Sequence, residues 1–224
     1  MSVQLILAFV LTVAALVVAT LFIRPGVARQ PAQPMLYAPL GMALLAVVAL
    51  LAPTPLDFVH KGAIVLGLIL ALIAVVFFSL EGTPPVVGFA QMLITYMLYF
   101  VASAVLTAWG WPTPWELVVL LIAGLLYWQL APRLHDLRGF GLAYLLALSL
   151  MLWQAVQLWA QTGRPWAMLG LAGALLLVLA NAVMALNTWV RPVRGAGILA
   201  PLAFFAGHSF VAWSVWGGST PWLR

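Results

Sequence analysis

The sequence predicts an all-α fold, a polytopic integral membrane protein in which about eight transmembrane helices form one bundle. Of its 224 residues, 66% are hydrophobic and only 6% are charged. A soluble domain carries roughly 25% charged residues, so this chain has too few charges to cover a surface that faces water. Eight spans of about 20 residues require about 160 residues. The remaining length suffices only for short loops, so we expect residues 1–224 to form a single transmembrane domain.

Apolar runs of roughly 20 residues follow one another along the chain. In order, we expect spans near residues 3–23, 35–52, 58–80, 85–108, 114–131, 139–160, 166–189 and 195–217. No Lys or Arg precedes the first span, and it is longer than the roughly 7–15 apolar residues of a signal peptide, so we expect a retained helix. Nearly continuous apolar sequence favours helices over the alternating segments of about 10 residues that build membrane barrels.

Each break between spans contains residues that end helices. In chain order the breaks are RPGVARQPAQP at 24–34, APTP at 52–55, EGTPP at 81–85, GWPTP at 110–114, PRLHDLRG at 132–139, QTGRP at 161–165 and RPVRG at 191–195. Proline has no N–H to donate to a helix, and it disfavours helical backbone at the residue before it. We therefore place the loops at these breaks.

The basic residues are unevenly divided between the two sides of the predicted bundle. The loops after the odd-numbered spans hold Arg24, Arg29, Arg133, Arg138, Arg191 and Arg194, whereas the opposite side holds Lys61, Arg164 and Arg224. Lys and Arg are enriched in cytoplasmic loops, so we expect the odd-numbered loops in the cytoplasm and both termini outside. Usage rich in Ala, Leu and Arg is typical of a GC-rich bacterial gene, which indicates the bacterial inner membrane.

Several classes of function are excluded by missing residues. The chain contains no cysteine, which rules out disulfides, thiolate nucleophiles and cysteine metal centres. The three histidines, His60, His135 and His208, lack the i, i+4 spacing of a helical metal site, and HExxH, CxxCH, Walker A and GxSxG motifs are absent. We expect no metal and no cofactor. The net charge of +5 indicates contact with anionic membrane lipids rather than nucleic acid.

Polar side chains within the spans are costly in hydrocarbon, so each is a candidate site residue. Gln91, Thr95 and Tyr99 recur at intervals of four and share one helix face, with Tyr96 beside it. We expect one polar pocket on the cytoplasmic side of the midplane, formed by Glu81, Gln91, Thr95 and Asn181, with His208 as a further candidate. Lys61 lies near the opposite face and joins this pocket only if its side chain reaches inward.

Each candidate also has a structural interpretation. Glutamine, asparagine and threonine in spans commonly make hydrogen bonds between helices, which applies to Gln91, Thr95 and Asn181. His208 is equally compatible with a packing role and a site role. Glu81 lies next to a loop, where a solvated carboxylate at the helix end is as reasonable as a catalytic acid. The Lys61 side chain can extend to the membrane interface instead.

Four segments together resemble the YhhN family, also called the TMEM86 or lysoplasmalogenase family. They are FFSLEG at 77–82, MLITYMLYFVA at 92–102, AGALLLVLANAVMALNTWVRP at 172–192 and LAFFAGHSFVAWSV at 202–215. The resemblance covers roughly residues 58–108 and 170–216. Residues that match the family pattern are Lys61, Ser79, Gly82 and Tyr99. The eight-span count agrees as well.

The chain departs from the family pattern at its acidic positions. Asn181 stands where the family has an aspartate, and Thr83 stands where it has a second one, with Glu81 two residues away. The histidine of the family's fourth helix falls at Tyr96, and the glutamine of its last helix falls at His208. The resemblance therefore implies the family fold more directly than the family chemistry.

The resemblance implies hydrolysis of the vinyl ether bond of a lysoplasmalogen, a lysophospholipid, to an aldehyde and a glycerophospho-alcohol. This reaction requires a proton at the vinyl carbon and water at the oxocarbenium carbon. Glu81 or His208 would supply the acid, since Asn181 and Thr83 cannot, and Asn181 would orient substrate or water. Substrate-binding residues implied by their positions are Lys61, Gln91, Thr95, Tyr96 and Tyr99.

Two other functions stay open. A catalytically inactive relative would serve as a lipid-binding or structural subunit of a larger membrane complex or homo-oligomer, and loss of both family aspartates favours this reading. A transporter or channel is less favoured, because few charged residues lie within the spans and the chain has no evident internal repeat.

Overall fold

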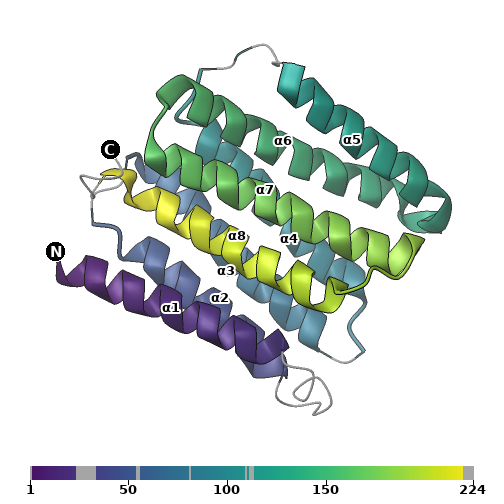
Figure 1. Ribbon diagram of the computed structural model, residues 1–224, viewed down its shortest axis with the longest axis horizontal. Helices are drawn as coiled ribbons and strands as arrows, with labels where there is room; N and C mark the ends of the chain where they lie inside the picture. Colours follow the sequence, from purple (N-terminus) through teal and green to yellow (C-terminus); the bar gives the residue numbers. More distant parts are fainter. Residues whose placement is uncertain are drawn as a thin grey trace.

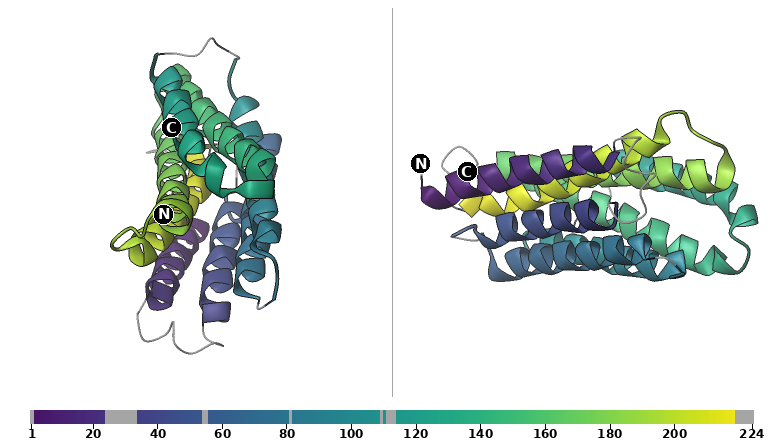
Figure 2. Two further views of the ribbon diagram at one scale, coloured as in Figure 1. Left: turned by 90° about the vertical axis from the view of Figure 1, so that its right-hand side faces the viewer. Right: turned by 90° about the horizontal axis from the view of Figure 1, so that it is seen from below.

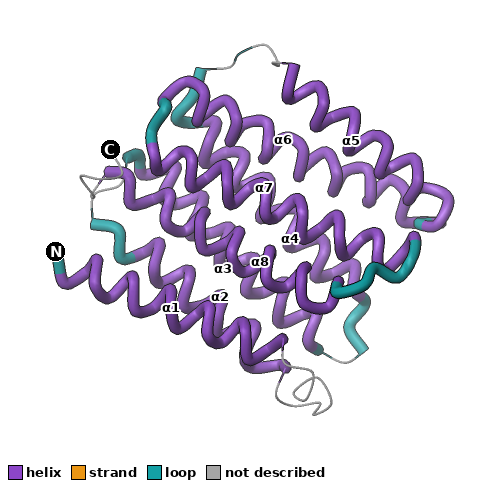
Figure 3. Tube along the Cα trace, viewed as in Figure 1, coloured by secondary structure: helices purple, strands orange, loops and turns teal. Residues whose placement is uncertain are grey.

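The computed structural model describes residues 2–23, 34–53, 56–80, 82–108, 110 and 114–218. In these ranges the chain forms eight α-helices and no strand, which confirms the all-α prediction (Figures 1 and 3). The helices are α1 (Val3–Ile23), α2 (Pro34–Leu50), α3 (Phe58–Ser79), α4 (Pro85–Ala104), α5 (Pro114–Leu130), α6 (Arg138–Thr162), α7 (Pro165–Ala185) and α8 (Ala196–Ser214). All eight begin and end within a few residues of the expected spans.

Six helical segments of the described chain are long and apolar enough to cross a membrane. They are Val3–Leu21, Phe58–Ser79, Pro85–Ala104, His135–Thr162, Pro165–Val190 and Ala196–Gly218. Two shorter apolar helical segments are Tyr37–Leu50, which lies within α2, and Leu117–Arg133, which includes most of α5 and the short 3-10 helix Ala131–Arg133 that follows it. The predicted count of about eight spans is therefore approximate.

The helices run alongside one another in an elongated bundle (Figure 2). α8 packs between α7 and α1, and α3 packs between α2 and α4. α2 also contacts α8, and α6 joins α4 to α7. α5 lies at the edge of the bundle against α6 (Figure 1). α8 is the most buried of the candidate spans, whereas α4 is buried only on one side, since residues such as Ile94 and Val101 are exposed. Tyr96, Tyr99 and His208 lie on the buried sides of these two helices.

Glycines set the closest approaches between helices. A Cβ added to Gly173 of α7 would lie 2.8 Å from the Gly207 carbonyl oxygen of α8, and the reverse distance is 3.0 Å. Without side chains at these two positions, the two backbones come into direct contact, as is common in membrane bundles. On α3, a Cβ at Gly67 would lie 2.5 Å from the Tyr99 ring of α4. These glycines place Tyr99 and His208, the residue after Gly207, in the interior.

The turn between α2 and α3 is held by two charged residues. Asp57 caps α3 by accepting hydrogen bonds from the backbone N–H groups of Val59, at 2.7 Å, and His60, at 3.0 Å. Lys61 donates from Nζ to the carbonyl oxygens of Leu50, at 2.9 Å, and Ala52, at 2.6 Å. The ammonium group therefore lies at the C-terminal end of α2, where a cation offsets the helix dipole.

Candidate functional site

Two tyrosines of α4, Tyr96 and Tyr99, position the polar groups in the centre of the bundle. They lie three residues apart, so they share one side of the helix. Both are buried, and each meets a polar residue from another helix. Tyr96 bonds to Asn181 of α7, and Tyr99 bonds to His208 of α8.

Asn181 joins three helices through its amide group. Its Nδ2 donates to the Tyr96 hydroxyl and to the Leu177 carbonyl oxygen, each at 2.7 Å. Its Oδ1 accepts a hydrogen bond from the Tyr144 hydroxyl of α6, also at 2.7 Å. An amide has two N–H donors and one carbonyl acceptor, so each of its polar groups is engaged. We call Tyr96, Tyr144 and Asn181 the asparagine network.

In the Tyr99–His208 pair, only one of the two imidazole nitrogens has a hydrogen-bond partner among the described residues. The Tyr99 hydroxyl lies 3.0 Å from His208 Nδ1, and His208 has no exposed surface. The ring of Phe204 packs against the imidazole, with ring centroids 4.5 Å apart. His208 Nε2 has no hydrogen-bond partner among the described residues. A hydroxyl can donate or accept, so either tautomer of His208 fits, and Nε2 can serve as donor or acceptor.

An aromatic cluster adjoins the asparagine network near the end of α3 and the start of α4. The Phe89 ring lies 5.0 Å from Phe78, 5.7 Å from Tyr144 and 5.9 Å from Trp189, measured between ring centroids. Tyr144 belongs to both groups, since it also contacts the Tyr96 ring at 5.6 Å. The network therefore lies beside an apolar aromatic lining at the end of the bundle that carries the α7–α8 loop.

The structure brings together only part of the predicted pocket. Tyr96 contacts Asn181, and Tyr99 contacts His208. Four predicted residues therefore form two neighbouring pairs, each of which includes one tyrosine of α4. Thr95 is buried, but its hydroxyl donates to the backbone oxygens of Gly67, at 3.3 Å, and Gln91, at 3.0 Å, and thereby links α4 to α3.

The other three predicted residues, Gln91, Lys61 and Glu81, are not part of these two pairs. The Gln91 side chain is half-buried, one helical turn before Thr95. Lys61 is engaged at the end of α2, away from the asparagine network. Glu81 lies outside the described residues. The expectation that all of these residues share one pocket thus stays a prediction. The structure defines the geometry of two pairs, Tyr96 with Asn181 and Tyr99 with His208.

Tyr144 and His60 are among the polar residues within the bundle that sequence reasoning missed. Tyr144 completes the asparagine network, and His60 is 2% exposed with its Nε2 unpartnered among the described residues. Tyr144 is an isolated polar side chain within an apolar run, which marks it as a candidate by the same criterion that selected Tyr96. His60 lies in the first turn of an expected span, and its spacing from the other histidines fits no metal site, so no sequence pattern distinguished it.

Comparisons with known proteins agree with the membrane fold. The model of the YhhN family matches residues 33–215. Curated relatives include the uncharacterized membrane protein YhhN of Escherichia coli O6:H1, of Escherichia coli O157:H7 and of Shigella flexneri, each 29% identical over 123 residues. These matches cover 55% of this chain and 58% of each relative, so the chain spans somewhat more than half the length of these relatives. No solved structure matches the chain.

Proposed function

The chain belongs to the YhhN family of membrane proteins, and on that premise we propose that it is a membrane hydrolase that cleaves the vinyl ether bond of lysoplasmalogen-type lysophospholipids. The observation that carries the proposal is the buried imidazole of His208. Its Nδ1 is held by Tyr99, and its Nε2 is unpartnered among the described residues. Ionisable groups within a membrane bundle are costly and mark functional sites.

The proposed reaction adds one water molecule and breaks one C–O bond. A proton is delivered to the vinyl carbon distal to the ether oxygen, which leaves an oxocarbenium ion. Water attacks the carbon next to oxygen and loses a proton, and the resulting hemiacetal releases an aldehyde and a glycerophospho-alcohol. The chemistry requires a group that gives a proton and a group that takes one.

His208 is the described residue best suited to this proton transfer. Through Nε2 it can accept the proton of the attacking water or donate a proton to substrate, while Tyr99 holds the imidazole in orientation. Asn181 does not contact the substrate in this proposal, because its amide is engaged by Tyr96, Tyr144 and the backbone. In this proposal it fixes the Tyr96 hydroxyl near the substrate rather than binding water itself. Glu81 stays the alternative acid.

The proposal includes a location and a source of substrate. A multi-pass protein with its basic loops in the cytoplasm would reside in the bacterial inner membrane and take its substrate from the surrounding lipid. The aromatic cluster around Phe89 supplies an apolar lining next to Tyr96, which suits a hydrocarbon chain.

A second candidate function rests on how the asparagine network is satisfied. Asn181 stands where the family has an aspartate, and its amide is engaged within the bundle. Lys61, a further residue of the family pattern, is engaged at the end of α2. Because the polar groups of both side chains are used for hydrogen bonds within the protein, they favour a catalytically inactive relative. Such a relative would serve as a lipid-binding or structural subunit, with another membrane protein or a second copy as partner.

The test is aldehyde release from a lysoplasmalogen by the purified, detergent-solubilised protein. We expect activity in the wild type and a loss of about 10²–10⁴-fold in His208→Gln, since glutamine keeps a hydrogen bond to Tyr99 but cannot carry the proton. The matched control is His135→Asn. His135 is an exposed loop residue with φ of 43°, a backbone conformation that asparagine tolerates. Its activity should equal that of the wild type.

A double variant distinguishes the two candidate functions further. Asn181→Asp combined with His208→Gln places the family residues at both positions, so activity should return if these positions form the reaction site. Glu81→Gln tests the alternative acid. Absence of aldehyde release from folded wild type, with lysolipids of several headgroups, would establish the inactive relative instead.

A further inference from the structure

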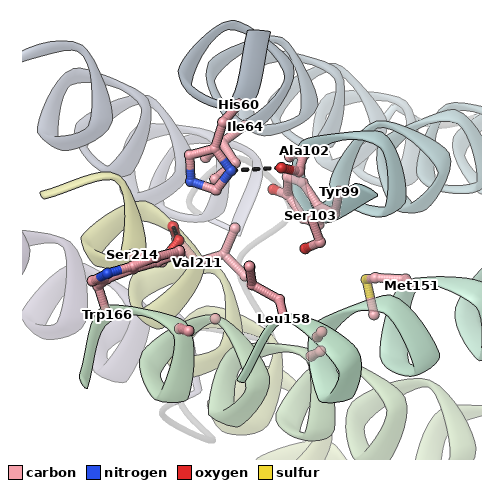
Figure 4. Close-up of a pocket in the computed structure, with 14 residues that line it drawn as sticks. His60, Ile64, Tyr99, Ala102, Ser103, Met151, Leu158, Trp166, Val211 and Ser214 are labelled. Carbon is pink, nitrogen blue, oxygen red and sulfur yellow. Dashed lines mark hydrogen bonds between the residues drawn. The ribbon is translucent and has the colours of Figure 1, made fainter. Parts of the chain in front are cut away.

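A small cavity lies near the end of the bundle where α3 and α7 begin and α8 ends (Figure 4). Residues of α3, α4, α6, α7 and α8 line it. The space open to the centre of a water molecule is about 20 Å³. One water requires roughly 10–15 Å³ by this measure. The cavity therefore has room for one water molecule and is too small for a lipid chain or headgroup.

His60 directs a hydrogen-bond acceptor into this cavity. Its Nδ1 lies 2.7 Å from the Ala102 carbonyl oxygen, and a carbonyl can only accept, so Nδ1 carries the proton. In the neutral imidazole, Nε2 is then a bare acceptor, and it is buried without a partner among the described residues. Figure 4 shows the ring pointing into the cavity, on the side facing Trp166 and Ser214. A molecule bound in the cavity must therefore donate a hydrogen bond to His60 Nε2.

A second polar group is available to the same bound molecule. The Ser214 hydroxyl donates to the Val211 carbonyl oxygen at 2.7 Å, which leaves its oxygen free to accept. Ser103 of α4 also lines the cavity. Water has two donors and binds where two to four polar partners converge, whereas a purely apolar cavity of this size stays dry. The lining thus meets the requirement for a bound water.

The cavity shares one wall with the Tyr99–His208 pair. Tyr99 lines the cavity, and its hydroxyl meets His208 Nδ1. We propose that the cavity is a binding site for one water molecule, which donates a hydrogen bond to His60 Nε2 and whose presence is coupled through Tyr99 to His208. The inference is independent of the proposed hydrolase, because it concerns a bound water and two imidazoles rather than turnover.

The test is nuclear magnetic resonance of protein with ¹⁵N-labelled histidine in lipid nanodiscs. The three histidines are assigned by single substitution, and ¹⁵N shifts report the tautomer of each. We expect the Nδ1–H tautomer for His60 and a magnetisation-transfer peak from water at its Nε2.

Gly170→Ala fills part of the cavity without a clash. A Cβ there would lie 3.7 Å from Ser214 Cβ and 3.9 Å from its Oγ, which are ordinary contacts. We expect loss of the water peak at His60 and a change in the resonances of both His60 and His208. The matched control is Gly124→Ala on α5, where a Cβ would meet no atom within 4 Å. This control should leave both histidines unchanged.

Ser214→Ala is a second variant that adds no volume. It removes one partner of the water, so the water peak at His60 should weaken while the cavity persists. A wild type without a water contact at His60, or a contact that survives Gly170→Ala, overturns the water site. His208 resonances that stay constant when the water is displaced overturn the coupling.

Discussion

Asn181 and His208 occupy the same interior, beside tyrosines three residues apart on α4, yet their hydrogen bonding differs. Each polar group of Asn181 is engaged, by Tyr96, Tyr144 and the Leu177 carbonyl oxygen. His208 has one bond, to Tyr99, and its second nitrogen is unpartnered among the described residues.

The difference separates a structural role from a chemical one. A satisfied amide in a bundle core stabilises the packing of the helices that it joins, and has no remaining group with which to bind a substrate. An unpartnered buried nitrogen costs free energy, so its presence calls for an explanation such as a bound water, a ligand or a reaction. Among the residues of the two groups, His208 is therefore the better candidate for chemistry.

The largest expected effect on stability is loss of the asparagine network. Asn181→Leu removes the amide that bonds to the hydroxyls of both Tyr96 and Tyr144, and we expect the free energy of unfolding to fall by about 2–4 kcal/mol. His208→Leu leaves only the Tyr99 hydroxyl without its partner and also removes a nitrogen that is already unpartnered, so its cost should be smaller, about 1–2 kcal/mol. The measurement is unfolding in mixed detergent micelles. Equal losses in the two variants would contradict the distinction between the groups.

An intermediate effect is expected where α7 meets α8. In Gly207→Ala the new methyl would lie 2.8 Å from Leu177 and 3.0 Å from the Gly173 carbonyl oxygen. Overpacking of this kind costs about 1–3 kcal/mol, and it should displace His208, the next residue. Gly197→Ala is the control on α8, because a Cβ there would meet no atom within 4 Å. Thermal unfolding should show a loss in the first variant and none in the second.

The smallest expected effect separates the two tyrosines. Tyr96→Phe leaves one amide hydrogen of Asn181 unpaired and should cost about 1–2 kcal/mol. Tyr99→Phe removes the bond to His208, where the site already tolerates an unpartnered nitrogen, and should cost about 0.5–1 kcal/mol. Unfolding in mixed micelles again provides the comparison. A greater cost for Tyr99→Phe would mean that His208 has mainly a packing role.

Much of the site could be nominated from sequence, but its connections could not. Asn181, Tyr96, Tyr99 and His208 are detectable because polar residues are rare in apolar spans. Thr95 is detectable by the same rule, yet its hydroxyl serves the backbone of α3 and α4. A polar residue in a span therefore identifies a hydrogen bond that must be made, and does not reveal the partner.

Lys61 illustrates the same limit at a helix end. Its side chain is long enough to reach the interior, the interface or a neighbouring helix. The turn between α2 and α3 brings it to the carbonyl oxygens of Leu50 and Ala52, and these contacts depend on the position of α2 relative to α3. Spacing along the sequence does not contain that information.

By itself the sequence determined the class of fold and the approximate bounds of every helix. Hydrocarbon requires backbone groups to bond within each segment, so long apolar runs between proline-bearing breaks become helices. The tertiary structure alone decided which polar groups meet. Contacts such as Tyr96 with Asn181 depend on helix rotation and depth, which are set by packing at sites such as Gly67, Gly173 and Gly207. The sequence contains 18 glycines, and only the packed bundle shows which of them lie where helices approach closely.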